Sequence, residues 1–239
     1  AVSGGIEMGQ GLNVKVAQTI SYALGAPLEM IEIKGPTTQT VSAASTTGGS
    51  TSSELCCSTA QMACDQMNTR LEAVRKANPG AAWADIVGAA SQAGVNLTVQ
   101  VQNTPSGDGY GAFDYFTYGA AVSQVEIDLL TGETEIMGSH VLMDLGQSIN
   151  PQVDVGQVEG AFAQGIGYYM TELVQYSSEG VPFVQGTWNY KPPTALDIPV
   201  EASVSLLKDT PNPAPSAFLG SKASGEPPYA LSSSVWFAI

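Results

Sequence analysis

The segment Lys222-Ala223-Ser224-Gly225-Glu226-Pro227-Pro228 holds one carboxylate between a glycine and two prolines, where the backbone has little freedom. Paired prolines suit the first turn of a helix. Apolar residues then recur at helical spacing, at Leu231, Val235, Trp236 and Ile239. We therefore predict that Glu226 lies at or just before a helix N-terminus, where the helix dipole favours an ionised carboxylate. A carboxylate there is either a positioned acid or base, or a simple helix cap, and both roles are open at this point.

The composition narrows the classes of partner. The 239 residues carry a formal net charge of -14 with only 8 Lys and Arg, which argues against nucleic acid or an anionic membrane surface as a partner. No apolar run is long enough to cross a bilayer, and the N-terminus lacks the pattern of a signal peptide. A chain of this length forms one large domain or two small ones. Because it lacks an initiating Met and stops within a helical pattern, we expect a fragment of a longer chain.

The cysteines predict packing rather than metal binding. The chain has three cysteines, Cys56, Cys57 and Cys64, which is an odd number, and none of them forms a C-x-x-C motif. It has one histidine, His140. This set favours neither a disulfide framework nor a zinc site. We expect reduced thiols in a cytoplasmic protein, with Cys57 and Cys64 packed two turns apart on a helix. On a predicted strand, His140 is expected to be structural.

A glycine-rich loop opens the chain. Residues 4–11 read Gly-Gly-Ile-Glu-Met-Gly-Gln-Gly, and a helical pattern follows up to the stop signal at Gly25. A loop of this kind before a helix N-terminus can bind an anion, because unpaired N–H groups point toward the ligand. Gly9, Gln10 and Gly11 are the candidate ligand-binding residues. No Lys-Ser/Thr follows, so the nucleotide-binding P-loop is not matched, and a plain tight turn is the alternative.

A second loop of small residues covers residues 42–53, with Gly48-Gly49 at its centre. Its composition is also that of a linker. Thr51 and Glu54 have capping-box spacing, and a long helical pattern follows up to Asn78-Pro79-Gly80. This segment is therefore a second loop that leads into a helix N-terminus.

The remaining patterns define the fold class. Residues 115–144 alternate between apolar and polar side chains around a Thr-Gly turn, which predicts a β-hairpin with one solvated face. A helix from Asp154 contains Gly156, Gly160, Gly165 and Gly167, each costing about 1 kcal/mol relative to Ala. These glycines suggest close approach by another backbone or a ligand, and Gln164 lies among them. Further elements are expected as strands at 30–33, within 94–112 and at 200–207, and a helix at 83–93. Without regular βα alternation, the class is α+β, with mixed sheets and packed helices.

Four motifs together carry a family resemblance. They are the segments 4–11, 116–128, 156–165 and 221–228, in that order along the chain. The chain resembles the C-terminal half of the molybdenum-binding domain of the xanthine dehydrogenase and aldehyde oxidase family. The resemblance covers nearly all of residues 1–239, so this range is expected to be the C-terminal portion of that domain.

The resemblance implies a molybdopterin cofactor whose metal is held by the pterin's dithiolene sulfurs and not by protein side chains. It further implies iron–sulfur clusters and FAD on parts of the enzyme outside this chain. Glu226 matches the family's general base. The residues that the resemblance implies for cofactor binding are Gly9, Gln10, Gly11, Thr47, Gly48, Gly49, Ser50, Ser52, Gln164 and Gly225.

The implied reaction is hydroxylation of an aldehyde or an N-heterocycle with oxygen derived from water. Gly48-Gly49, Gly186-Thr187-Trp188 and Ser224 favour an aldehyde oxidase, with a purine-hydroxylating xanthine dehydrogenase as the alternative. The implied partners are a small-molecule substrate, the enzyme's other domains or subunits, and a second copy in a homodimer. The isolated fragment is expected to be inactive. The alternative from another class is a non-catalytic module that binds a pterin or another anion, or only packs against a subunit.

Overall fold

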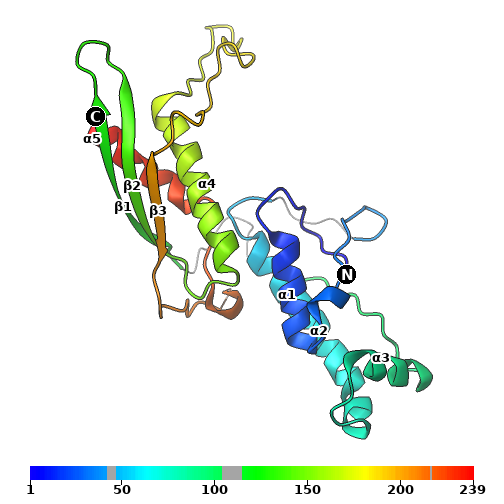
Figure 1. The fold of residues 1–239 in the computed structure, drawn as a ribbon. Helices are drawn as coiled ribbons and strands as arrows, with labels where there is room; N and C mark the ends of the chain where they lie inside the picture. The colour runs from blue at the N-terminus through cyan, green and yellow to red at the C-terminus, as the bar shows by residue number, and fades with distance from the viewer. Residues whose placement is uncertain (42–46, 104–114, 216) are drawn as a thin grey trace. The chain divides into compact units, whose positions relative to one another are not determined.

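In the computed structural model the chain forms two compact units, residues 1–114 and 115–239. The structure describes residues 1–41, 47–103, 115–215 and 217–239 (Figure 1). Within these ranges, no helix combines the length and the apolar character needed to span a bilayer.

The first unit is helical. Its elements are α1 (Leu12–Leu24), the 3-10 helix η1 (Leu28–Met30), α2 (Ser52–Ala77) and α3 (Trp83–Gln92). The stop signal after α1 is confirmed, because Gly25 has a φ of 64°, a left-handed conformation in which glycine avoids the steric cost of a Cβ. The starts predicted for α2 and α3 are also confirmed.

Polar contacts and an apolar cluster hold these helices together. Two side chains of α2 satisfy the last carbonyls of α1: Asn68 Nδ2 donates to Ala23 O at 2.8 Å, and Arg75 Nη2 donates to Leu24 O at 2.6 Å. Carbonyls at a helix end have no partner within the helix, so α2 supplies the missing donors. A buried cluster between α2 and α3 consists of Leu71, Val74, Ile86 and Ala90.

The cysteines lie on α2, as predicted. Cys57 and Cys64 are buried, and all three thiols are free. Burial raises the pKa of the Cys57 thiol to about 11, against the opposing hydrogen bond with Thr19. Burial likewise raises the pKa of Cys64 to about 11. Both thiols therefore stay protonated at neutral pH and act as small packing groups.

Two strand predictions in this unit are wrong. Met30 is instead the last residue of the 3-10 helix η1, residues 31–33 have no regular secondary structure, and an isolated bridge joins Lys34 to Val2. Residues 95–103 form no strand, and the remainder of that prediction, from 104 on, lies outside the described residues. The side chain of Arg70 donates to the carbonyls of Asn96 and Thr98 at 3.0 and 2.7 Å. These carbonyls thus find a side-chain donor where a sheet would offer a backbone N–H.

The second unit contains the sheet. Strands β1 (Tyr118–Ile127) and β2 (Thr134–Asp144) pair antiparallel, and β3 (Glu201–Leu206) adds parallel to β2. The helical elements are α4 (Pro151–Met170), the 3-10 helices η2 (Phe218–Gly220) and η3 (Pro227–Ser232), and α5 (Ser233–Ala238). The α+β class with a mixed sheet is confirmed, and so is the predicted hairpin.

The core of this unit lies between one face of the sheet and the helices. Figure 1 shows α4 and α5 along the sheet. A register shift between Gln124 and Val125 leaves one extra residue in β2, which is a β-bulge. Buried positions of β2 around it are therefore Ile136 before the bulge, and Ser139 and Val141 after it. Without this bulge, Ile136 and Val141 would face opposite sides of the sheet. The buried cluster consists of Ile136, Val141, Met143, Leu145, Val158, Phe162, Ile166 and Val235.

Helix α4 begins at Pro151 rather than at the predicted Asp154, because Asn150 caps it by accepting a hydrogen bond from Val153 N at 3.2 Å. Of its glycines, Gly165 and Gly167 do meet close neighbours. A Cβ on Gly165 would lie 2.8 Å from the carbonyl oxygen of Tyr229. Gly156 and Gly160 meet nothing within 4 Å, so close approach within the chain explains only the C-terminal half of the pattern.

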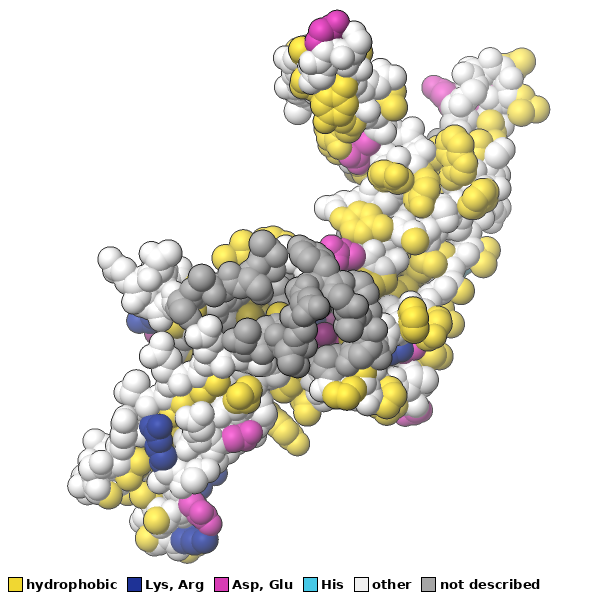
Figure 2. Space-filling view, turned by 180° about the vertical axis from the view of Figure 1, so that it is seen from behind, with side chains coloured by type: hydrophobic (Ala, Val, Ile, Leu, Met, Phe, Trp, Pro, Cys, Tyr) yellow, Lys and Arg dark blue, Asp and Glu magenta, His cyan; other side chains and the backbone are white. Residues whose placement is uncertain are grey.

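Apolar side chains are common on the surface of the chain. Leu130 is 97% and Trp188 is 93% exposed. Figure 2 shows apolar side chains spread over much of the face drawn.

Candidate functional site

Glu226 occupies the N-cap position of η3, as the sequence predicts. The first turns after it are 3-10 rather than α-helical, and α5 continues them from Ser233. The Glu226 side chain is exposed and makes no capping hydrogen bond to the helix. The sequence left two roles open for Glu226, a positioned acid or base and a helix cap. The structure does not contain the hydrogen bond that would define the capping role.

Close packing against α4 fixes the position of η3. Gly165 has no side chain, so the backbone of Tyr229 and the side chain of Ser232 approach α4 closely. Ser232 Oγ donates to the carbonyl of Phe162 at 2.8 Å. The Tyr229 hydroxyl donates to Gln164 Oε1. The structure therefore brings together two separately predicted site elements, the Gln164 segment and the helix that begins at Glu226.

Gln164 borders a hollow in the surface of the second unit with a volume of about 630 Å³. Its lining is mainly aromatic and proline side chains. The residues are Gln164, Gly165, Tyr168, Tyr169, Glu172, Pro192, Pro193, Tyr229 and Ala230. The Tyr190 hydroxyl donates to Glu172, and this hydrogen bond raises the pKa of Tyr190. One wall of the hollow is therefore fixed by a bond between two segments.

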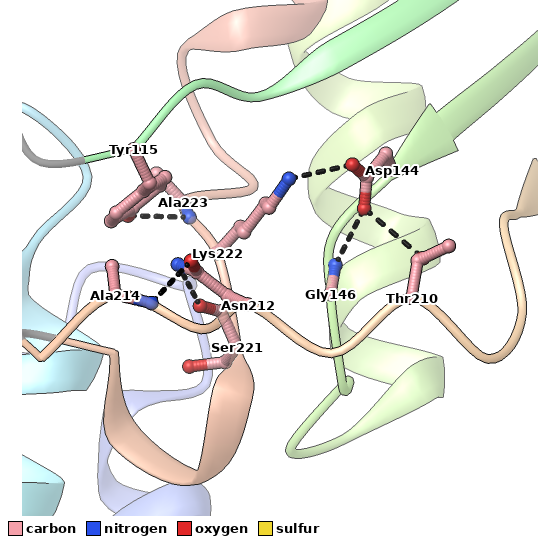
Figure 3. A network of polar contacts seen from close by, with 9 residues as sticks. All are labelled: Tyr115, Asp144, Gly146, Thr210, Asn212, Ala214, Ser221, Lys222 and Ala223. Carbon is pink, nitrogen blue, oxygen red and sulfur yellow. Dashed lines mark hydrogen bonds and ion pairs between the residues drawn. The ribbon is translucent and has the colours of Figure 1, made fainter.

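The segment before Glu226 is tied to the end of β2 by an ion pair. Lys222 Nζ lies 2.6 Å from Asp144 Oδ2, and the two side chains are only 9% and 11% exposed (Figure 3). Asp144 Oδ1 also accepts from Gly146 N at 3.0 Å and from Thr210 Oγ1 at 3.3 Å. Burial alone would raise the pKa of Asp144, but the Lys222 ammonium and the other donors outweigh it and lower the pKa. The carboxylate is therefore ionised near neutral pH.

Further hydrogen bonds hold the same segment. Lys222 N donates to Leu145 O at 3.0 Å, and Ala223 N donates to the Tyr115 hydroxyl at 3.0 Å. Ser224 Oγ donates to Asp154 Oδ1 at 3.3 Å, in the first turn of α4. The three residues after Ser221 are therefore each attached to a different part of the unit.

In the first unit, the loop before α1 binds a carboxylate of its own. Gly9 N and Gly11 N each donate to Glu7 Oε1 at 3.0 Å, and Asn13 N donates to Glu7 Oε2 at 2.9 Å. Gly9 and Gly11 have φ values of 100° and 71°. Gln10 also bonds within the loop, accepting from Met8 N at 2.7 Å. The N–H groups at this helix N-terminus thus bind a carboxylate of the same loop, that of Glu7.

The loop before α2 has a special backbone conformation. Gly49 has a φ of 65° and Ser50 one of 55°, while Thr47 and Gly48 are exposed. The predicted capping box is wrong, because Thr51 Oγ1 donates to Gly48 O at 3.3 Å and α2 has no side-chain cap. Ser52 is the first residue of α2. The exposed loop therefore leads into a helix N-terminus whose N-cap residue, Thr51, makes no side-chain capping bond.

The predicted site residues divide between the units. Gln164, Gly225 and Glu226 lie within residues 115–239, whereas the residues from Gly9 to Ser52 lie within residues 1–114. Sequence reasoning did not identify Lys222 and Asp144 as site residues. Lys222 stands in the quoted segment, but Asp144 is separated from it by 78 residues and carries no local signal.

Within the described residues, no group of three or more His, Cys, Asp or Glu side chains has an arrangement that could hold a metal ion.

The comparisons with known proteins identify the family. Residues 1–199 match the model of the molybdopterin cofactor-binding domain. Over 99% of the chain, it is 40% identical to a xanthine dehydrogenase of Drosophila pseudoobscura pseudoobscura and 42% identical to a xanthine dehydrogenase/oxidase of Felis catus. It is 39% identical to aldehyde oxidase 1 of Macaca fascicularis, also over 99% of the chain. The chain spans 18% of the length of each of these relatives.

Solved structures agree with this fold. Quinoline 2-oxidoreductase from Pseudomonas putida 86 matches 96% of this chain and 32% of its own, with a TM-score of 0.76 and 24% identity. A Cu,Mo-CO dehydrogenase matches 99% of this chain and 32% of its own, with a TM-score of 0.75 and 21% identity. The chain therefore belongs to the molybdopterin cofactor-binding domain family, and its relatives within that family are xanthine dehydrogenases and aldehyde oxidases.

Proposed function

We propose that this chain is the C-terminal portion of the cofactor domain of a molybdenum hydroxylase, in which Glu226 acts as the general base. The overall reaction adds a water-derived oxygen to the carbon of an aldehyde or an N-heterocycle and releases two protons and two electrons. One observation carries the proposal. The Glu226 carboxylate is exposed at the start of η3 without capping that helix, and η3 is packed beside Gln164.

The loops fit an anionic, hydrogen-bonding cofactor. A Cβ on Gly9 or on Gly48 would meet nothing within 4 Å, so a ligand has room to approach the backbone there. The side chain of Thr51, the N-cap residue of α2, does not cap that helix, and a helix N-terminus suits a phosphate. In the second unit, Gln164 Oε1 already accepts from Tyr229, so the donors on Nε2 are the part of that side chain suited to a ligand.

Bound molybdopterin would supply a metal centre that transfers oxygen and accepts two electrons. The chain's own contribution is binding and proton transfer. Residues 47–52 would hold the anionic parts of the cofactor, while Gly9 and Gly11, whose N–H groups bind Glu7, would let the cofactor approach the loop closely. Glu226 would accept a proton from the attacking oxygen nucleophile. A base held at the start of a short helix keeps its position during the reaction, which reduces the entropy lost in reaching the transition state.

An aldehyde is the proposed substrate, on the basis of Gly48-Gly49, Gly186-Thr187-Trp188 and Ser224. The identities to xanthine dehydrogenases and to aldehyde oxidases differ too little to support either choice. The ratio of turnover rates with an aromatic aldehyde and with a purine tests this preference. The other domains of the enzyme, with their iron–sulfur clusters and FAD, are the proposed partners of exposed side chains such as Trp188. A homodimer of the complete enzyme in the cytoplasm belongs to the same proposal.

The test is Glu226→Gln in the full-length holoenzyme that carries this chain. The amide keeps the shape of the carboxylate but is a far weaker base. We expect the single-turnover rate of substrate reduction of the metal centre, per bound molybdenum, to fall by at least about 10²-fold, with molybdenum content unchanged. Glu201→Gln is the matched control, because Glu201 is an exposed glutamate in the same unit at the start of β3.

A capping role for Glu226 predicts a different result: a stability loss of about 0.5–2 kcal/mol and nearly unchanged turnover. A variant within about threefold of the wild-type rate would fall short of a general-base loss and contradict the assignment. A full-length protein that holds no molybdenum or pterin would instead favour a non-catalytic packing module.

A further inference from the structure

The Lys222–Asp144 ion pair is a buried ionic contact that could act on the reaction without touching substrate. The pair is close, at 2.6 Å, and its side chains are 9% and 11% exposed. Lys222 Nζ also lies 5.4 Å from the centre of the Tyr118 ring, so an aromatic face covers the ammonium. Charges removed from water in this way interact strongly with each other and are costly to separate.

The pair joins the end of strand β2 to the segment that leads to Glu226. Asp144 is the last residue of β2, the central strand, and it also binds Gly146 N and Thr210 Oγ1. Lys222 begins the segment that ends at Glu226. Figure 3 shows Lys222 reaching from that segment to Asp144, with Ala223 held by Tyr115. The ion pair thus attaches the segment to the end of the central strand of the sheet.

The hydrogen bonds of the two residues after Lys222 have neutral donors. Ala223 N donates to Tyr115 at 3.0 Å, and Ser224 Oγ to Asp154 at a longer 3.3 Å. Among these side-chain and backbone contacts of residues 222–224, the ion pair is the strongest attachment, because both of its partners are charged.

We propose that the Lys222–Asp144 ion pair is a positioning device that fixes the location of Glu226 for proton transfer. This inference rests on the proposed function, since it assigns the pair to the same reaction. Lys222 and Asp144 are positioning residues and touch neither substrate nor cofactor in this proposal. A shift of about 1 Å in a reacting group lowers a rate by about 10²-fold, so a loosened segment lowers turnover while substrate binding persists.

The experiment compares four variants of the full-length holoenzyme. Lys222→Met removes the charge and keeps the length of the side chain, and Lys222→Arg restores a cation. The double variant Lys222→Met with Asp144→Asn removes both charges, so no buried carboxylate is left unpaired. Lys208→Met is the control, because Lys208 is an exposed lysine in the same unit.

Two readouts separate positioning from folding. The first is hydrogen exchange of the peptide that covers residues 222–226, which reports the order of the segment independently of activity. The second is the single-turnover rate per bound molybdenum, measured together with the substrate dissociation constant. In Lys222→Met we expect exchange at least about tenfold faster, a rate about 10- to 100-fold lower, and a dissociation constant within about threefold of wild type.

The double variant decides the case if Lys222→Met folds poorly. Because its buried site is neutral, it should melt close to wild type, yet its exchange should stay fast and its rate low. Lys222→Arg should recover most of the lost rate, and Lys208→Met should match wild type in both readouts. A double variant with wild-type rate would show that the pair acts only on folding and would overturn the proposal, and so would unchanged exchange in Lys222→Met.

Failure of the proposed function has a separate signature. Glu226→Gln should lower the rate while leaving the exchange of residues 222–226 unchanged. If Glu226→Gln does not lower the rate, the general-base assignment fails on its own evidence. A different outcome is a low rate in Glu226→Gln together with a wild-type rate and fast exchange in Lys222→Met. That outcome would support Glu226 as the base and overturn the positioning proposal.

Discussion

The thiol of Cys57 is fully buried on α2, at 0% exposure, and Cys64 is 4% exposed. Burial raises the pKa of both thiols to about 11, because the charged thiolate loses its hydration. A group whose protonated form is favoured in the folded state stabilises the fold at lower pH. Its contribution declines as the pH rises from about 8.5, the usual thiol pKa, toward 11.

These thiols should therefore react slowly. At pH 8.5 we expect Cys57 and Cys64 in the folded full-length protein to react with iodoacetamide at least about 10²-fold more slowly than in the guanidinium-unfolded protein. Peptide mass spectrometry measures the labelling at each position. Cys56, which is only half-buried, serves as the internal comparison and should be labelled first. Equal labelling of Cys56 and Cys57 in the folded protein would contradict the buried position of Cys57.

At the scale of elements, the site depends on loops that enter helices. Gly49 has a φ of 65° and precedes α2, and a Cβ there would only touch a methyl group of Thr51 at 3.8 Å. The described residues therefore leave room for a side chain at Gly49, although its positive φ would strain any other residue. In our proposal, a bound cofactor is the further obstacle to a larger residue.

Gly49→Val tests this loop in the full-length holoenzyme. We expect molybdenum and pterin content to fall severalfold, because the valine side chain occupies the space proposed for the cofactor. The matched control is Gly180→Val, since Gly180 has a φ of 82° and also has space around it. Both variants carry a similar backbone strain of about 1–3 kcal/mol. If both keep full cofactor content, the assignment of Gly48, Gly49 and their neighbours to cofactor binding is wrong.

At the scale of the whole molecule, acidic residues outnumber basic ones by 22 to 8, so most carboxylates have no cation to pair with. Exposed pairs such as Lys76–Glu72, with side chains 75% and 62% exposed, contribute little to stability. The buried Lys222–Asp144 pair is different, since loss of one partner leaves a charge in a poorly hydrated site. Sensitivity to acid should therefore concentrate at this pair.

Asp144→Asn should expose that sensitivity. The folded-state pKa of Asp144 is lowered, so its stabilising contribution is present above the unfolded pKa of about 3.9 and is lost as the pH falls through the folded pKa. We expect the full-length variant to melt well below wild type at pH 6, a loss of about 3–5 kcal/mol, and the difference to narrow below about pH 4. Glu72→Gln, at the exposed pair, should change the melting temperature little at either pH. A wild-type to Asp144→Asn difference independent of pH would contradict the lowered pKa.

The sequence by itself determined the elements whose signals are local. The periodicity of apolar residues and the stop at Gly25 defined α1, and alternation around the turn at Thr131-Gly132 defined the hairpin. The prolines after Glu226 placed it at a helix start, because proline suits the first turn whatever surrounds it. Four motifs in one order also sufficed for the family, since each reflects a local backbone requirement.

Only the tertiary structure decided which distant groups meet. Residues 30–33 have a strand-like composition, but they form no strand, because a strand exists only where a neighbour supplies backbone partners. The capping role of Thr51 failed for a similar reason, since its hydroxyl donates to Gly48 instead. Asp144 and Lys222, 78 residues apart, have no pattern that links them. Their pairing follows from the position of β2 in the sheet and the course of the chain after η2, and buried charges are stable only where the fold brings such partners together.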